Sequence, residues 1–328
     1  MMELVKHMLA GDVLSLARLV TKVERDGAEV PEIMKLVYPQ LGKAYCVGLT
    51  GPPGAGKSTV VDRLTALIRQ RGFTVGIIAA DPTSPFSGGA VLGDRIRMQQ
   101  HYLDDGVFIR SMATRGSQGG LPRSTGGVIK LLSAFGKDFV LVETVGVGQT
   151  ELDIMENVDT TAVILVPEAG DTIQTMKAGL FEIADIFAVN KADRPGADNL
   201  VTELTMMVHL HSKQGSWQAP VMATEAINDI GIDDLYNQIE KHRQALEESG
   251  RLSQRRQEQR RREFIEMVER RVSGELLRLV ERDKEMSKYM AMVEAGEIDP
   301  YSAADEILRP RTLLASWSRQ LAEKRPDD

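Results

Sequence analysis

One glycine-rich segment constrains the fold of this chain more than any other feature. An apolar run is followed by Gly51-Pro52-Pro53-Gly54-Ala55-Gly56-Lys57-Ser58 and then by a helical stretch, which is the pattern of a phosphate-binding loop. Glycines let the backbone N–H groups curl around a phosphate, and the start of the following helix adds its positive end. The residues expected to bind the nucleotide here are Gly54, Ala55, Gly56, Lys57, Ser58 and Thr59.

The surroundings of this loop predict an α/β fold, a P-loop NTPase with a mainly parallel sheet flanked by helices. Short β-branched runs alternate with helical stretches between residues 44 and 245, as in sheets that helices cover on both faces. The expected strands are Tyr45–Thr50, Thr74–Ala80, Val107–Met112, Phe139–Glu143, Thr161–Pro167, Ile186–Asn190 and Val221–Thr224. Residues 1–43 and 246–328 are expected to form an N-terminal and a C-terminal helical arm around the P-loop domain of residues 44–245.

A second motif points to guanine as the base. Asn190-Lys191-Ala192-Asp193 follows a predicted strand, and nucleotides bind at the C-terminal ends of strands in open α/β sheets. The Asp193 carboxylate can accept hydrogen bonds from the ring N–H and the exocyclic amine of guanine, and adenine offers neither donor in that geometry. Thr224-Glu225-Ala226 closes the last strand, where the Ala226 N–H is expected to donate to the guanine carbonyl. The alternative is that these three residues form an ordinary loop.

Three acidic residues are candidates for binding Mg²⁺ together with the Ser58 hydroxyl. Glu143 ends an apolar run and is followed by Thr144-Val145-Gly146, so the usual DxxG sensor of magnesium and γ-phosphate takes the form ExxG and includes Gly146. Asp81 ends another predicted strand, and Asp94 lies in a Gly-rich segment, where a helix N-cap is its alternative role. Because Mg²⁺ takes few protein ligands beside phosphate oxygens and water, some of these carboxylates are expected to act through water.

Several longer motifs together resemble one family of GTPases. They are GPPGAGKST, DPTSP, GGAVLGDRIRM, RSMATRGSQGG, ETVGVGQTE, VPEAGDTIQTMKAG, NKAD and DPYSAADEIL. In this combination the chain resembles the methylmalonyl-CoA mutase-associated GTPases of the MeaB/ArgK type, formerly labelled LAO/AO transport ATPases. They belong to a branch of P-loop GTPases related to signal-recognition-particle and metal-insertion proteins. The resemblance covers nearly the whole chain.

The resemblance implies a homodimeric chaperone that hydrolyses GTP, gates the loading of adenosylcobalamin into an acyl-CoA mutase, and protects or reactivates that enzyme. It implies no cobalamin bound by this chain itself, and it does not single out the client mutase. By motif match, it places Ser58, Asp81, Asp94 and Glu143 at the family's magnesium site. It places Asp171, Gln174 and Lys177 in the family's partner-sensing switch.

The C-terminal arm carries an apolar stripe of Phe264, Val268, Val272, Leu276 and Leu279. Residues four apart lie on one face of a helix, so this stripe requires a partner surface. The resemblance implies that the arm makes the dimer, which would cover the stripe.

The catalytic residues are less easily read than the binding residues. In many small GTPases a glutamine directly after the DxxG glycine orients the attacking water, and here that position holds Val147, with Gln149 further along. Catalytic roles are assigned to Lys57, Asp94 and Glu143. We expect slow intrinsic hydrolysis that a partner accelerates by reordering Asp94, Arg115 or Lys177, although a plain surface charge is the alternative for Arg115.

Composition and the remaining motifs separate the competing functions. A formal net charge of −7 argues against nucleic acid as the main partner. Five histidines without a His-rich tract, and a single cysteine, Cys46, argue against a nickel-type metallochaperone. The sequence shows no apolar span of about 20 residues, the length that a membrane segment needs. A cytoplasmic protein without a membrane partner is therefore expected. The alternative function is a nucleotide-dependent assembly or metal-insertion factor for another enzyme, which binds GTP without needing turnover.

Overall fold

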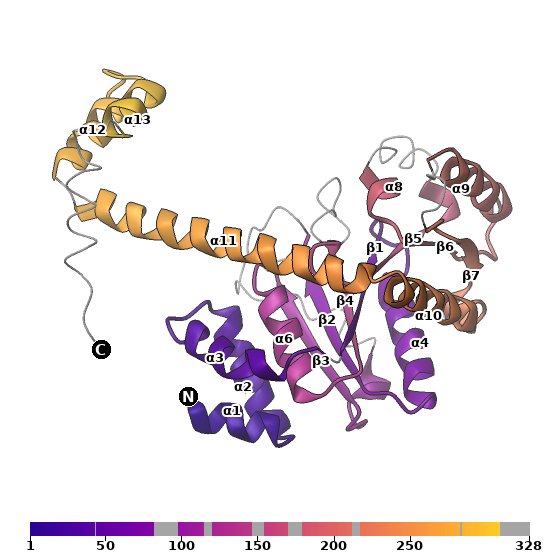
Figure 1. The fold of residues 1–328 in the computed structure, drawn as a ribbon. Helices are drawn as coiled ribbons and strands as arrows, with labels where there is room; N and C mark the ends of the chain where they lie inside the picture. The colour runs from indigo at the N-terminus through magenta and orange to yellow at the C-terminus, as the bar shows by residue number, and fades with distance from the viewer. Residues whose placement is uncertain are drawn as a thin grey trace. The chain divides into compact units, whose positions relative to one another are not determined.

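The chain folds around a sheet of parallel strands, as its sequence predicts. The computed structural model describes residues 1–42, 44–81, 98–114, 120–145, 154–169, 179–211, 217–282 and 284–308. The sheet has the order β3-β2-β4-β1-β5-β6-β7, and all its pairs are parallel (Figure 1). The strands are β1 (Tyr45–Thr50), β2 (Val75–Asp81), β3 (Val107–Ala113), β4 (Phe139–Glu143), β5 (Thr160–Leu165), β6 (Ile186–Asn190) and β7 (Val221–Thr224). Each observed strand overlaps its predicted run, and the predicted fold class is confirmed.

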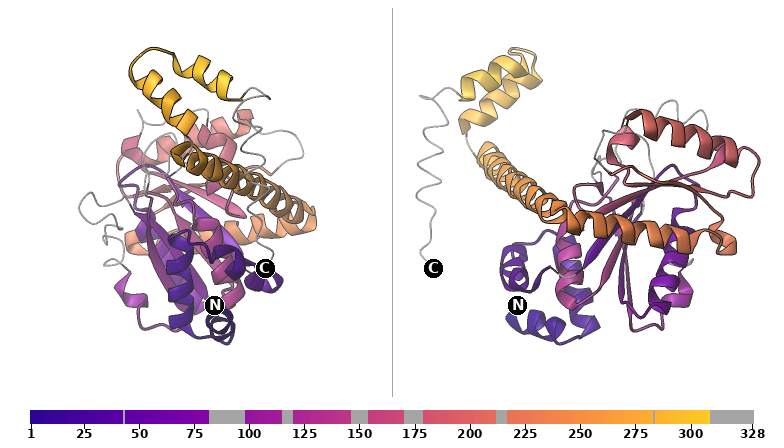
Figure 2. Two further views of the ribbon diagram at one scale, coloured as in Figure 1. Left: turned by 90° about the vertical axis from the view of Figure 1, so that its left-hand side faces the viewer. Right: turned by 45° about the vertical axis from the view of Figure 1, so that its right-hand side comes forward.

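Helices cover both faces of the sheet (Figure 2). On one face α4 (Lys57–Gln70) packs against α10 (Ile232–Glu248) and the central strands. On the other face lies α6 (Thr125–Phe135). Successive strand side chains point to opposite faces, so Tyr45 and Val47 enter the core beneath α4, whereas Cys46 enters the core beneath α6. The remaining elements of the domain are η2 (Gln99–His101), η4 (Pro167–Ala169), α8 (Gly179–Ile183), α9 (Ala197–His211) and η5 (Ala226–Asn228).

The N-terminal residues form helices that pack against α6. They are α1 (Met2–Leu9), α2 (Val13–Glu24) and α3 (Val30–Val37), followed by η1 (Tyr38–Gln40). The Asp12 side chain caps α2 by accepting hydrogen bonds from the N–H groups of Leu14 and Ser15. These helices share one buried core with α6, so the predicted N-terminal arm is part of the same compact unit as the GTPase domain.

The chain divides into two compact units, Met1–Arg256 and Gln257–Asp328. The first unit includes α10 and the first residues of α11 (Arg251–Arg282). The second unit contains α12 (Lys284–Glu294) and α13 (Pro300–Leu308), which are linked by a hydrogen bond of 2.9 Å from the Tyr289 hydroxyl to Glu306. No helix in the described ranges is long and apolar enough to cross a membrane.

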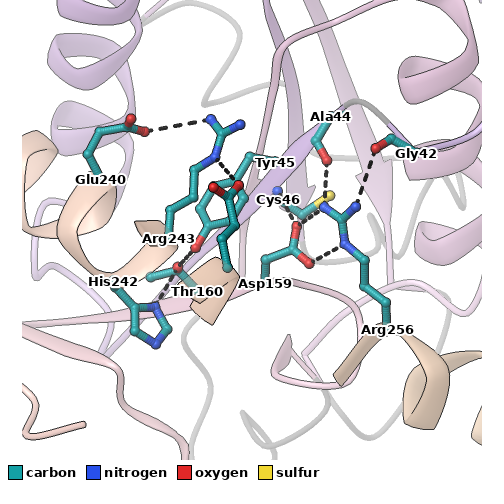
Figure 3. A network of polar contacts seen from close by, with 11 residues as sticks. Gly42, Ala44, Tyr45, Cys46, Asp159, Thr160, Glu240, His242, Arg243 and Arg256 are labelled. Carbon is teal, nitrogen blue, oxygen red and sulfur yellow. Dashed lines mark hydrogen bonds and ion pairs between the residues drawn. The ribbon is translucent and has the colours of Figure 1, made fainter. Parts of the chain in front are cut away.

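A polar network fixes the first residues of α11 to the edge of the sheet where the strands begin (Figure 3). The Arg256 guanidinium donates to both Asp159 oxygens at 2.8 and 2.7 Å, and the Cys46 N–H donates to the same carboxylate at 2.9 Å. The hydrogen bonds to Asp159 hold the pKa of Arg256 above its ordinary value. The nucleotide motifs lie at the opposite edge, where the strands end.

Candidate functional site

The phosphate loop joins β1 to α4, and two of its glycines leave no room for a side chain. Gly51 has φ +139°, and a Cβ added there would lie 2.0 Å from the Ile164 carbonyl oxygen. Gly56 has φ +85°, and its Cβ would lie 2.4 Å from Nδ2 of Asn190. At Gly54, by contrast, a Cβ would meet nothing within 4 Å. The loop is therefore closed against β5 and β6 and open on the side of Gly54, which suits a cradle for phosphate.

Lys57 is the first residue of α4 and is almost fully buried, at 6% exposure. Its ammonium group donates to the carbonyl oxygens of Gly51 at 2.8 Å and Pro52 at 3.1 Å. The positive charge is thus held within the span of the loop, next to the positive end of α4. This is the position in which a lysine stabilises β- and γ-phosphate charge.

Ser58 and two strand-end carboxylates, which the sequence predicts as magnesium ligands, lie at the C-terminal ends of the strands. The Ser58 hydroxyl donates to Oε1 of Glu143 at 2.7 Å. Asp81 ends β2, which pairs with β4 such that Ala79 lies opposite Glu143, so Asp81 lies on the strand beside that carboxylate. Ser58, Asp81 and Glu143 are 6%, 3% and 3% exposed.

These groups suit Mg²⁺ in the presence of nucleotide. The described residues hold no group of three or more His, Cys, Asp or Glu side chains that could bind a metal alone. Mg²⁺ typically uses one or two carboxylates together with phosphate oxygens and water. A hydroxyl and two buried carboxylates beside a phosphate loop match that requirement, and the absence of sulfur or nitrogen ligands from this set disfavours zinc.

Asn190 connects the phosphate loop to the loop that follows β7. Its Nδ2 donates to the Ala55 carbonyl at 2.8 Å. Its Oδ1 accepts hydrogen bonds from the Ala226 N–H at 3.1 Å and from the Thr224 hydroxyl at 3.3 Å. The Asn190 side chain is only 3% exposed, so it acts as a buried hub between three segments that are far apart in the sequence.

The hub also engages the backbone of Ala226. The sequence predicts that its N–H donates to the guanine carbonyl, but the structure uses this N–H to hold Asn190. Ala226 is 1% exposed, so this hydrogen bond braces the loop that follows β7, and its bond to guanine stays a prediction. Glu225 also braces this loop, since its N–H donates to the Ile230 carbonyl at 2.9 Å.

Lys191 and Asp193 lie in the turn after β6. Lys191 has φ +58°, a backbone conformation that is uncommon for residues other than glycine and that clusters at functional sites. Its ammonium donates to the Gly54 carbonyl at 2.8 Å. The Asp193 side chain is exposed, as required of a carboxylate that a base is to reach. Thr59, in the first turn of α4, is half-buried.

The sequence does not predict one pair of hydroxyls that lies at the C-terminal ends of the strands. Thr50 ends β1 and Thr144 follows β4, and their Oγ1 atoms lie 3.0 Å apart in the core, both at most 1% exposed. The sequence signal was weak: Thr50 directly follows an apolar run, and Thr144 follows Glu143, which ends another. Other predicted residues lie outside the described part of the chain: Asp94, Arg115, Gly146, Gln149, Asp171, Gln174 and Lys177.

Comparison with known proteins identifies the family of this chain. The model of the family described as methylmalonyl Co-A mutase-associated GTPase MeaB matches residues 16–280. The chain is 50% identical over 310 residues to a putative GTPase of Pyrococcus abyssi, covering 94% of this chain and 95% of the relative. It is 32% identical over 329 residues to the GTPase ArgK of Escherichia coli, covering 98% and 95%.

A solved structure gives the same result for the fold. The crystal structure of an LAO/AO transport system kinase superposes with a TM-score of 0.68 at 26% identity, covering 93% of this chain and 95% of the other. These matches confirm the resemblance found in the motifs. The chain belongs to the methylmalonyl Co-A mutase-associated GTPase MeaB family.

Proposed function

We propose that this GTPase uses GTP and Mg²⁺ to gate the loading of adenosylcobalamin into an acyl-CoA mutase, and that it protects or reactivates the same enzyme. The Asn190 hub is the observation that carries the nucleotide half of the proposal, because it ties the phosphate loop to the loop that would surround a guanine base. Membership of a family named for methylmalonyl-CoA mutase supports the client half.

In this function each described residue has a definite task. Lys57 stabilises the negative charge that develops on the phosphates, and Asp193 reads the guanine edge. Ser58, Asp81 and Glu143 hold Mg²⁺, with Asp94 as a further ligand from outside the described residues. When bound there, Mg²⁺ would supply positive charge that offsets the charge of the phosphates.

Regulation is proposed to depend on a partner. The chain is proposed to act as a cytoplasmic homodimer, with Asp171, Gln174 and Lys177 sensing the mutase, and without nucleic acid or a membrane as a partner. Intrinsic hydrolysis is slow in this proposal because no glutamine stands directly after the ExxG glycine. The mutase accelerates hydrolysis by ordering the switch.

Two measurements on purified protein test the proposal. Phosphate release should be faster with GTP than with ATP, should stop when a chelator removes Mg²⁺, and should rise when methylmalonyl-CoA mutase is added. Transfer of adenosylcobalamin into the mutase should differ between GTP and a non-hydrolysable analogue. If transfer is the same with and without this chain, the chaperone role is wrong. If GTP binds but no phosphate is released with or without the mutase, the assembly-factor alternative is supported instead.

A further inference from the structure

An open groove runs along α2, away from the nucleotide site. It has a volume of about 520 Å³ and lies between α1, α2 and the edge strand β3, and it is open to solvent rather than enclosed. Its apolar lining comes from Leu4, Leu14 and Ala17. Its other lining residues include the cations of Arg18, Lys22 and Arg25 on α2 and Arg110 on β3. We call this surface the α2 groove.

The groove exists because α2 presents two different faces. Leu16, Leu19, Val20 and Val23 are at most 4% exposed and pack into the core. The groove residues of α2 fall at positions 14, 17, 18, 21, 22 and 25, which are spaced as one continuous face of a helix. Leu14 is 68% exposed on that face, and a large exposed apolar side chain beside an apolar floor is typical of a contact surface.

The charge of the groove is also unbalanced. Lys22 pairs with Glu29 at 2.8 Å, and Arg110 pairs with Glu24, so these two cations are already compensated. Arg18 and Arg25 are exposed, and neither has an ion-pair partner among the described residues. Two uncompensated guanidinium groups therefore flank the apolar floor, at a spacing of two helical turns.

We propose that the α2 groove docks an acidic, amphipathic helix of a protein partner. Apolar residues on one face of that helix would cover Leu4, Leu14 and Ala17. Its carboxylates would pair with Arg18 and Arg25, because planar guanidinium groups suit bidentate recognition of carboxylates. A small free anion fits less well, since ligand pockets bury roughly 70–90% of their ligand and this groove is open. A nucleic-acid backbone fits less well too, because it offers no apolar face to cover Leu14, and Glu29 and Glu24 already pair with Lys22 and Arg110.

A synthetic helix tests this directly on the full-length chain. The probe is a labelled peptide with leucines at helical spacing and glutamates beside them, and binding is followed by fluorescence anisotropy. The double substitution Arg18→Glu with Arg25→Glu should weaken binding by about tenfold or more and reduce its salt dependence, and Leu14→Ser should also weaken it. The matched control is Lys6→Glu with Lys35→Glu, which makes the same charge change on exposed residues of α1 and α3 outside the groove and should bind like the wild type.

Equal binding by the groove variant and the control overturns the proposal, as does equal binding of a scrambled peptide or of duplex DNA. If the Glu variant loses its cooperative thermal unfolding, Arg18→Gln with Arg25→Gln replaces it in the same comparison. A second arm, which rests on the proposed function, measures binding of methylmalonyl-CoA mutase to the same variants. Loss of mutase binding in the groove variant alone supports the proposal and identifies the client as the partner. If the wild type binds the acidic peptide but not the mutase, the proposed client fails while the groove is upheld.

Discussion

Lys57 shows how much a single buried charge contributes to this site. Its ammonium is held by the carbonyls of Gly51 and Pro52 and is not part of the apolar core. Lys57→Ala should therefore leave the fold intact and lower the rate of phosphate release by about a hundredfold or more, since a positioned cation stabilises charge in the transition state. The control is Arg71→Ala at the far end of the same helix, where Arg71 pairs with Asp233 on the surface. A near-normal rate in Lys57→Ala would show that this loop does not bind the reacting phosphates.

Asp193 allows a test of base recognition that leaves phosphate binding untouched. Asp193→Asn replaces one carboxylate oxygen by an amide N–H₂, which faces the guanine amine donor to donor but pairs with the carbonyl that xanthine has at that position. Each such bond is worth on the order of 1–3 kcal/mol, so the preference should move from GTP towards XTP by roughly tenfold to a thousandfold. Competition binding of GTP, ATP and XTP to both proteins measures this. A mutant that keeps its preference for GTP would remove Asp193 as the base reader.

At the scale of elements, Asn190 at the end of β6 connects the loop after β1 to the loop after β7. Asn190→Ala would leave the Ala55 carbonyl and the Ala226 N–H without their partner in a buried place. The expected loss is about 1–3 kcal/mol of unfolding free energy, which corresponds to a fall in Tm of roughly 2–10 °C for a domain of this size. GTP affinity should fall as well. Asn228→Ala, an exposed asparagine in the loop after β7, serves as the control and should change neither quantity measurably.

The same elements show how far the sequence alone predicts this molecule. Phe139–Glu143, Ile186–Asn190 and Val221–Thr224 were predicted with their observed bounds, because short β-branched runs that end in a polar residue are characteristic of buried parallel strands. The proximity of Ser58 and Glu143 follows from the same reasoning, since both stand at the C-terminal edge of the sheet.

The connections across the sheet could not be predicted in this way. The contact between Asn190 and Ala55 can be predicted only when the strand order is known. The same holds for the contact between Asp159 and Arg256. No spacing in the sequence encodes that order. For the same reason, the sequence does not predict that the Ala226 N–H donates a hydrogen bond to Asn190.

The network at the opposite edge of the sheet makes stability depend on pH through His242. This histidine is 1% exposed; its Nδ1 lies 2.8 Å from the Thr160 hydroxyl and its ring lies against Trp217. Burial lowers the pKa of His242, more than the nearby Asp185 raises it. The unfolded chain therefore binds more protons than the folded one below the ordinary pKa of about 6.5, and stability falls as the pH drops through that window.

Thermal unfolding between pH 7.5 and 5.5 tests this effect. Wild-type Tm should fall with decreasing pH, and His242→Gln should show a smaller fall, whatever its Tm at neutral pH. His209→Gln, an exposed histidine on α9, is the control and should keep the wild-type slope. Equal slopes for the wild type and His242→Gln would mean that other groups cause the acid sensitivity.

At the scale of the whole molecule, α11 carries a stripe of exposed apolar side chains. Phe264, Val268 and Val272 are 68%, 44% and 55% exposed, and their spacing places them on one face of the helix. The predicted stripe also includes Leu276 and Leu279, whose side chains are not among those that the structure describes. An exposed apolar face of this kind is stable in water only when another surface covers it. We expect a second copy of the chain to do so.

Light scattering on point variants tests the dimer without removing the arm. Val272→Glu would place a charge within the apolar interface, where desolvation is costly, so the dimer should weaken by about tenfold or more. Ser273→Glu adds the same charge to the next exposed residue, which points about 100° away around the helix axis, and it should leave the dimer unchanged. Truncation after Arg256 keeps the ion pair with Asp159 and removes the stripe, so it should give a monomer. A truncated chain that stays dimeric would place the dimer interface on the first unit. A Val272→Glu variant that associates as well as Ser273→Glu would place the interface away from the stripe.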